Sequence, residues 1–90
     1  MVSINKYTVV TTLRAQKDIE TLPSFIKEKI KNVSEELSVN PYLGKPLKWV
    51  LKGLYTLRLG NYRIIYMVGH KIITITIIKV RHRKAVYRDS

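Results

Sequence analysis

Alternating apolar and polar residues mark two strands in the middle of the chain. The alternation runs from residue 54 to residue 59 and again from residue 62 to residue 68, and only Gly60 and Asn61 separate the two runs. Period-two alternation on both sides of a Gly/Asn pair is typical of a β-hairpin with a two-residue turn. We therefore expect an antiparallel hairpin here, and the rest of the chain is interpreted around it.

The register of this hairpin places two arginines opposite each other. With Gly60-Asn61 as the turn, Leu59 pairs with Tyr62, and Arg58 pairs with Arg63 on the other face of the sheet. Like charges that are directly opposed on one face destabilise a sheet. The arginine pair therefore indicates a surface that receives an anion.

Further elements are predicted before the hairpin. Residues 7–12 are rich in β-branched and aromatic types, which predicts a first strand. A short helix is expected over residues 13–22, and Pro23 suits the first turn of a second helix. The second helix should end at Asn40, because the residue before a proline avoids the helical region. Its apolar residues recur at spacings of four, three and four, which forms one stripe along the helix. The stripe consists of Ile26, Ile30, Val33 and Leu37.

After the hairpin the pattern predicts one more strand, over residues 72–80, following a second two-residue turn at Gly69-His70 that sets Val68 opposite Lys71. If that strand ran straight on, Arg81 would point toward the core. We therefore expect the strand to bend or stop near residue 80, so that the C-terminal segment folds over the open face of the sheet.

Extending this register gives the sheet one apolar face and one positively charged face. The expected fold class is α+β: an N-terminal strand, an antiparallel helix pair, and a three-stranded antiparallel meander that completes a four-stranded sheet. Residues 41–52 should form a loop or an irregular strand, and the whole chain, residues 1–90, should be a single domain. The predicted core face carries Leu57, Leu59, Tyr62, Ile64, Tyr66, Ile73, Ile75 and Ile77.

Positive charge is concentrated in the second half of the chain. The formal net charge is +11. Residues 1–40 hold six Lys/Arg and five Asp/Glu, whereas residues 41–90 hold eleven Lys/Arg and a single acid, Asp89. Such an imbalance indicates a polyanion or an acidic protein as the partner. The alternative is a solvated basic face with no specific partner.

Composition excludes several classes of site. There is no cysteine, and two histidines alone cannot form a structural zinc site. Nearly all acids lie in the helical half, so metal-dependent nuclease chemistry is not expected, nor is any metal or cofactor. The N-terminus lacks the long apolar segment of a signal peptide, and the apolar run at 72–80 is too short to span a membrane. We expect a cytoplasmic protein with no membrane partner.

The remaining candidate chemistry is cationic. Arginines at positions 58, 63, 81 and 83 can neutralise a phosphate and stabilise the charge of a phosphoryl transition state without a metal. RNA carries its own nucleophile, the 2′-hydroxyl, so such a site needs only orientation, a base and an acid. Either Tyr87 or His82 could serve as the base, and an arginine or lysine could support the leaving 5′-oxygen.

Three motifs resemble the RelE/ParE toxin superfamily. They are Gly44-x-Pro46-Leu47, then Gly53-Leu54-Tyr55-x-Leu57-Arg58-x-Gly60-x-Tyr62-Arg63-x-x-Tyr66, and then His82-Arg83-x-x-Val86-Tyr87-Arg88. The likeness covers nearly the whole chain and implies a small basic α+β toxin. For the RelE branch it implies cleavage of mRNA in the ribosomal A site, which leaves a 2′,3′-cyclic phosphate and a 5′-hydroxyl.

The resemblance also implies roles for individual residues. Arg63 matches the arginine that contacts the scissile phosphate, Arg81 the arginine that stabilises the transition state, and Tyr87 the base or stacking group. Arg58 stands where the family often has a lysine or arginine. Thr56 departs from the family, which commonly has a second basic residue there. Further RNA-binding residues are expected at Lys48, Lys52, His82, Arg83, Lys84 and Arg88, of which Lys52, Arg83 or Lys84 could compensate for the threonine.

The implied partners are a cognate RelB-like antitoxin with acidic or helical segments, the ribosome with its mRNA, and operator DNA bound by the toxin–antitoxin complex. Two alternatives stay open. The ParE branch shares the fold and is implied to inhibit DNA gyrase without cutting RNA. A degenerate member would only bind RNA.

Overall fold

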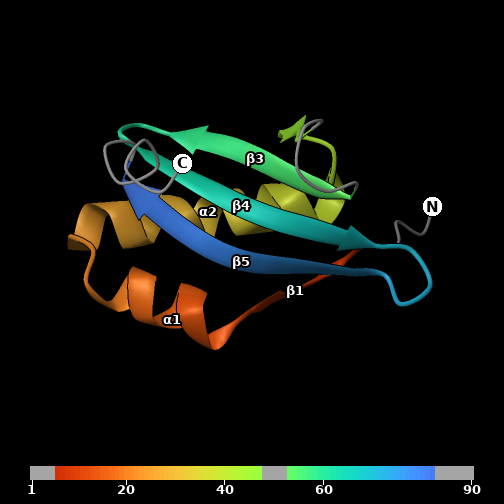
Figure 1. Ribbon diagram of the computed structural model, residues 1–90, viewed down its shortest axis with the longest axis horizontal. Coiled ribbons are helices and arrows are strands. Elements are labelled where there is room, and N and C mark those ends of the chain that lie inside the picture. The colour runs from red at the N-terminus through yellow and green to blue at the C-terminus, as the bar shows by residue number, and fades with distance from the viewer. Residues whose placement is uncertain (1–5, 48–52, 83–90) are drawn as a thin grey trace, which may run out of the picture.

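The computed structural model describes residues 6–47 and 53–82. Within these residues, two helices and a five-stranded sheet form the fold, with strand order β1-β5-β4-β3-β2 (Figure 1). This arrangement confirms the α+β class. The elements are β1 (Thr8–Thr11), α1 (Leu13–Glu20), α2 (Ser24–Val39), β2 (Lys45–Pro46), β3 (Leu54–Leu59), β4 (Tyr62–Gly69) and β5 (Thr74–His82).

The sheet differs in two details from the four-stranded antiparallel sheet expected from the sequence. It is mixed, because β1 pairs with β5 in parallel while the other pairs are antiparallel. It also includes β2, which pairs with β3 through Lys45 opposite Thr56 and Pro46 opposite Tyr55. A two-residue strand is too short to show any alternation in the sequence, so the pattern at residues 41–52 indicated only an irregular segment.

The apolar stripe of α2 is buried against the sheet, as its spacing predicted. Pro23 precedes the first turn of α2, and Asn40 follows the last. Neither described helix is long and apolar enough to cross a membrane. The core consists of Ala15, Ile26, Ile30, Val33, Leu37, Ile64, Tyr66, Val68, Ile75, Ile77 and Val80. Since fully burying one such side chain contributes roughly 1.5–3 kcal/mol, the docking of α2 is a major source of stability.

The β3–β4 hairpin has the predicted register. Leu59 pairs with Tyr62 and Arg58 with Arg63. Gly60, the first turn residue, has a φ of 62°, in the left-handed region that glycine adopts most easily. Local sequence was therefore sufficient to define this hairpin.

The turn between β4 and β5 is longer than predicted. Val68 pairs with Ile75 instead of Lys71, so the connection is not a two-residue turn at Gly69-His70. The difference from the predicted pairing is an even number of residues, and an even shift keeps each side chain on its face of the sheet. Ile75 is accordingly buried, as predicted, whereas Ile73 lies in the loop with 40 % of its surface exposed and is not part of the core.

A β-bulge interrupts β5 in its middle. Tyr66 pairs with Ile77, but the preceding residue of β4, Ile65, pairs with Lys79. Ile78 is therefore an extra residue on β5. A bulge of this kind changes which side chains face the core from that point onward.

The bulge explains how β5 continues where a bend was expected. Beyond it, Val80 is buried and Arg81 pairs with Arg63, so the arginine lies on the open face without any break in the strand. The prediction that the strand would bend or stop near residue 80 is wrong, because β5 extends to His82. The extra residue moves Arg81 from the core face to the open face, which is the change that the bend was expected to make.

Helix α1 holds the outer edge of β5 beyond the end of β1. β1 ends at Thr11, and the next residue, Thr12, donates a hydrogen bond from Oγ1 to the carbonyl of Ile78 at 2.6 Å. The amide of Val80 donates to Oδ2 of Asp18 at 3.1 Å. Buried or half-buried backbone groups must find such partners. Thr12, the N-cap of α1, and the side chain of Asp18 thus make hydrogen bonds to the bulged part of β5 that a neighbouring strand would otherwise make.

Candidate functional site

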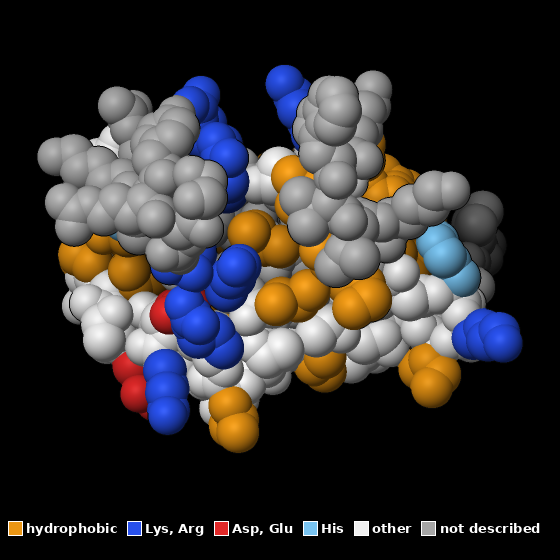
Figure 2. Space-filling view, in the orientation of Figure 1, with side chains coloured by type: hydrophobic (Ala, Val, Ile, Leu, Met, Phe, Trp, Pro, Cys, Tyr) orange, Lys and Arg blue, Asp and Glu red, His pale blue; other side chains and the backbone are white. Residues whose placement is uncertain are grey.

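Three arginines form a row across three neighbouring strands. Arg58 on β3 pairs with Arg63 on β4, which in turn pairs with Arg81 on β5. Because adjacent strands lie about 4.8 Å apart, the three Cα atoms span only about 10 Å. Figure 2 shows Lys and Arg side chains gathered on this face of the sheet, the face opposite α2. We call these three residues the arginine row.

The arginine row is electrostatically unfavourable by itself. Like charges on paired positions repel each other. An anion bound between them would turn this repulsion into attraction, and guanidinium groups bind phosphate and carboxylate through paired N–H donors. The row brings together three of the four residues predicted to be catalytic.

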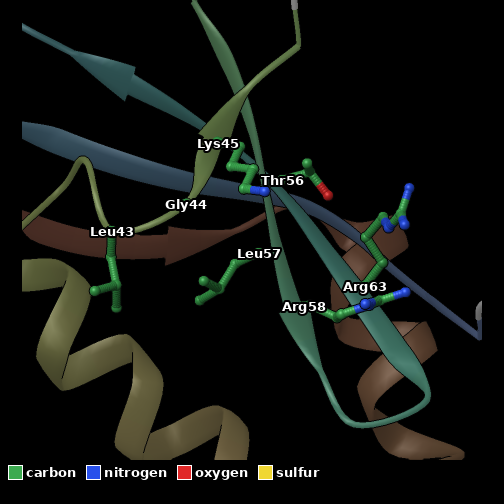
Figure 3. A pocket seen from close by; sticks show the side chains of 7 residues that line it. All are labelled: Leu43, Gly44, Lys45, Thr56, Leu57, Arg58 and Arg63. Carbon is green, nitrogen blue, oxygen red and sulfur yellow. The ribbon is translucent and has the colours of Figure 1, made fainter.

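A cavity of about 440 Å³ opens beside Arg58 and Arg63. In Figure 3 the side chains of Lys45, Thr56 and the two arginines lie on one side of the sheet. The lining residues are Leu43, Gly44, Lys45, Thr56, Leu57, Arg58 and Arg63, none of them acidic. A cavity whose described lining holds three cations and no carboxylate suits an anionic ligand.

Tyr66 fixes the segment that leads to Lys45. Its hydroxyl donates a hydrogen bond to the carbonyl of Pro41 and accepts one from the amide of Gly44, both at 2.9 Å. Gly44 lies so close to β3 that an added Cβ would be 2.6 Å from the carbonyl oxygen of Thr56. Burial raises the pKa of Tyr66, so the phenol stays protonated at neutral pH and keeps its donated hydrogen bond.

Thr56 lines the cavity and pairs with Lys45 on the neighbouring strand. Its Oγ1 is buried and has no hydrogen-bond partner among the described residues. The resemblance to the RelE/ParE superfamily implied that β3 has one cation fewer at this position than the family pattern. The pairing of β2 with β3 supplies a lysine at the same place, which sequence reasoning missed because β2 is too short to leave a pattern.

His82 is not brought together with the arginine row by the strand pairing. It pairs with Tyr62, and their rings meet edge to face with centroids 5.2 Å apart. Tyr62 packs against the core, so the pairing places His82 on the helical side of the sheet. His82 lines a surface hollow there with Arg14 and Asp18 of α1, and of the row only Arg81 reaches this hollow among the described residues. Its expected contact with RNA stays a prediction.

The other predicted site residues lie outside the described residues, and their roles stay predictions. They are Lys48, Lys52, Arg83, Lys84, Tyr87 and Arg88. Among residues 6–47 and 53–82, no group of three or more His, Asp or Glu side chains could hold a metal ion.

Comparison with protein families and curated relatives gives a consistent result. A family model described as the ParE toxin of type II toxin–antitoxin systems, parDE, matches residues 9–87. Toxin RelG of Mycobacterium tuberculosis is 36 % identical over 84 residues, which cover 91 % of this chain and 97 % of the relative. Toxin RelE of the same organism is 37 % identical over 84 residues, covering 91 % of this chain and 87 % of the relative.

Solved structures show the same fold. The toxin–antitoxin complex RelBE2 from M. tuberculosis contains a chain that matches with a TM-score of 0.80 and 34 % identity, covering 90 % of this chain and 95 % of that one. The RelB–RelE antitoxin–toxin complex from Methanococcus jannaschii matches with a TM-score of 0.74 and 30 % identity, covering 89 % and 96 %.

Proposed function

Because this chain belongs to the RelE/ParE superfamily of toxins from type II toxin–antitoxin systems, we propose that it is an endoribonuclease that cleaves mRNA in the ribosomal A site. The observation that supports this proposal best is the arginine row. Arg58, Arg63 and Arg81 occupy paired positions on three neighbouring strands, and the first two line a cavity that has no acidic residue among the described residues of its lining.

The proposed reaction needs only groups of the protein and of the RNA. The 2′-hydroxyl attacks the adjacent phosphorus, the bond from phosphorus to the 5′-oxygen breaks, and the products are a 2′,3′-cyclic phosphate and a 5′-hydroxyl. Negative charge increases on the phosphoryl oxygens in the transition state, where Arg63 and Arg81 stabilise it and Arg58 supports them. The proton of the 2′-hydroxyl passes to a base, for which we propose Tyr87, and a cationic side chain protonates the leaving 5′-oxygen.

The ribosome is the proposed source of substrate orientation. An isolated basic cavity attracts RNA without fixing the orientation of the backbone, so free RNA should be cut poorly. Holding the mRNA in one geometry aligns its 2′-hydroxyl with the adjacent phosphate and with the catalytic side chains, and such orientation is worth several orders of magnitude in rate. This places the proposed activity in the cytoplasm, where ribosomes translate.

We further propose that a cognate antitoxin inhibits the protein. The related toxin chains from M. tuberculosis and M. jannaschii were solved in complexes with antitoxins. An antitoxin with acidic or helical segments would complement the basic second half of this chain, whose net charge exceeds that of the first half. The complex is the species that we expect to bind operator DNA.

Inhibition of DNA gyrase is the second candidate, because the matching family model is named for ParE toxins. Cell-free translation followed by primer extension on the mRNA separates the two. Wild-type protein should produce cuts at A-site codons that disappear in Arg81→Ala and persist in the control Lys27→Ala, whose lysine is exposed on α2, away from the row. Intact mRNA together with blocked DNA supercoiling would instead establish the gyrase function.

A further inference from the structure

Lys45 lies outside the arginine row but faces the same cavity. It is the first residue of β2 and pairs with Thr56, which precedes Arg58 by two residues on β3. Residues two apart on a strand share a face, so Lys45 and the arginine row lie on the same side of the sheet. Figure 3 shows the ammonium end of Lys45 beside Thr56.

We propose that Lys45 forms a second phosphate subsite, which binds the RNA backbone next to the phosphate held by the arginine row. This inference rests on the proposed function and names a residue that contacts its substrate. Lys45 lies one strand beyond Arg58 and two residues along, so their Cα atoms are separated by about 8 Å at ordinary sheet spacings. Two cations at this separation can hold two different phosphates of one strand.

The surroundings of Lys45 favour an anion over an internal partner. None of the described residues that line the cavity is acidic. The short side chain of Thr56 leaves space beside β3 for the lysine, and its buried Oγ1 has no hydrogen-bond partner within the described part of the chain. A phosphate oxygen is an acceptor of the kind that this hydroxyl lacks.

The position of Lys45 is fixed by the segment before it. The hydroxyl of Tyr66 binds the backbone at Pro41 and Gly44, and Gly44 is packed directly on β3. Lys45 therefore starts from an anchored backbone, although its own side chain is exposed. An anchored backbone lowers the entropy lost when a flexible lysine binds a ligand.

The test measures binding of a short, single-stranded, fully 2′-O-methylated RNA, which the protein cannot cleave, between 50 and 200 mM salt. Lys45→Ala should weaken binding about tenfold at the lowest salt, the effect expected for one charged hydrogen bond. It should also lower the slope of log affinity against log salt by about 0.7, the value for one phosphate contact to a single strand. Lys45→Gln, which keeps most of the side-chain volume, should behave in the same way. The matched control Lys31→Ala, on α2, should leave both quantities unchanged.

A charge exchange between the paired strands makes the test specific. In Lys45→Ala combined with Thr56→Lys, the cation returns from the opposite strand, and the salt slope should recover. Unchanged binding in Lys45→Ala, with weakened binding in Arg63→Ala, would overturn this inference and leave the proposed function standing. Binding that is insensitive to both substitutions would overturn the two together.

Discussion

The two hairpins of the sheet build the same site in different ways. The β3–β4 hairpin is regular, with a two-residue turn and the register expected from alternation, and it sets Arg58 opposite Arg63. The β4–β5 hairpin has a longer loop and a bulge, and it adds Arg81 to the row. The comparison shows that the site needs one regular and one irregular pairing, because a regular β5 would turn its arginine toward the core.

The irregular hairpin depends on contacts from outside itself. The bulged part of β5 is held by Thr12 and Asp18, which lie more than sixty residues earlier in the chain. The regular hairpin is supported by the short segment before β2, through the hydroxyl of Tyr66. Each support can be removed separately, so the difference between the hairpins can be tested.

Val80→Asp should have the largest effect, because the bulge is what turns Val80 into the core. Losing one buried apolar side chain costs roughly 1.5–3 kcal/mol, and burying a charge costs several more. This approaches the whole stability of a small domain. Thermal unfolding should show a protein that is unfolded or barely folded at 25 °C, whereas Lys79→Asp, on the neighbouring residue that the bulge turns to the open face, should melt close to wild type. A Val80→Asp variant that melts like wild type would show that the bulge does not set the faces of β5.

Removing one member of the arginine row should be the next largest effect. Arg63→Ala and Arg81→Ala should each lower the rate of cleavage of ribosome-bound mRNA by about 100-fold or more, which is typical for the loss of one transition-state donor. Arg58→Ala should cost less, because its role is supporting. Single-turnover rates measure this, with Lys27→Ala, on the exposed side of α2, as the control. Equal, small losses at all three positions would indicate that the row only attracts RNA.

Asp18→Ala should weaken the irregular hairpin selectively. The amide of Val80 loses its acceptor, at a cost of about 1–3 kcal/mol. Hydrogen exchange of that amide should become faster, and mRNA cleavage should fall because Arg81 is less well positioned. Asp18→Asn retains an acceptor oxygen and should lie between wild type and the alanine variant. Full protection of the amide in Asp18→Ala would show that α1 does not hold this edge.

Tyr66→Phe should weaken the support of the regular hairpin. At neutral pH its effect should be smaller than that of Asp18→Ala. Two backbone groups lose their partner, which lowers the free energy of unfolding by about 1–2 kcal/mol. Because burial raises the pKa of Tyr66, the folded protein holds the phenolic proton more tightly than the unfolded chain does. The stabilising contribution is complete below about pH 10, the ordinary value, and is lost as the pH rises through the raised pKa.

Denaturant unfolding at neutral and alkaline pH tests this. The difference between wild type and Tyr66→Phe should shrink as the pH rises above 10. A difference that is constant with pH would mean that the phenol does not ionise in this range in either state, contrary to the account.

The sequence predicted the features that depend on neighbouring residues. The hairpin register, the α2 stripe and the α+β class all follow from local periodicity. The bulge at Ile78, the pairing of Lys45 with Thr56 and the parallel pairing of β1 with β5 depend on contacts between distant parts of the chain. The alternation of side chains along β5 did show that a regular strand would turn Arg81 toward the core. It could not distinguish a bend from a bulge.

The most direct test of the proposed chemistry is cleavage of a ribosome-bound mRNA that carries a single 2′-deoxyribose on the 5′ side of the mapped cut. The proposed reaction uses the 2′-hydroxyl as the nucleophile, so this message should remain intact while the all-ribose message is cut and ends in a 2′,3′-cyclic phosphate. Cleavage of the substituted message at the normal rate would contradict it.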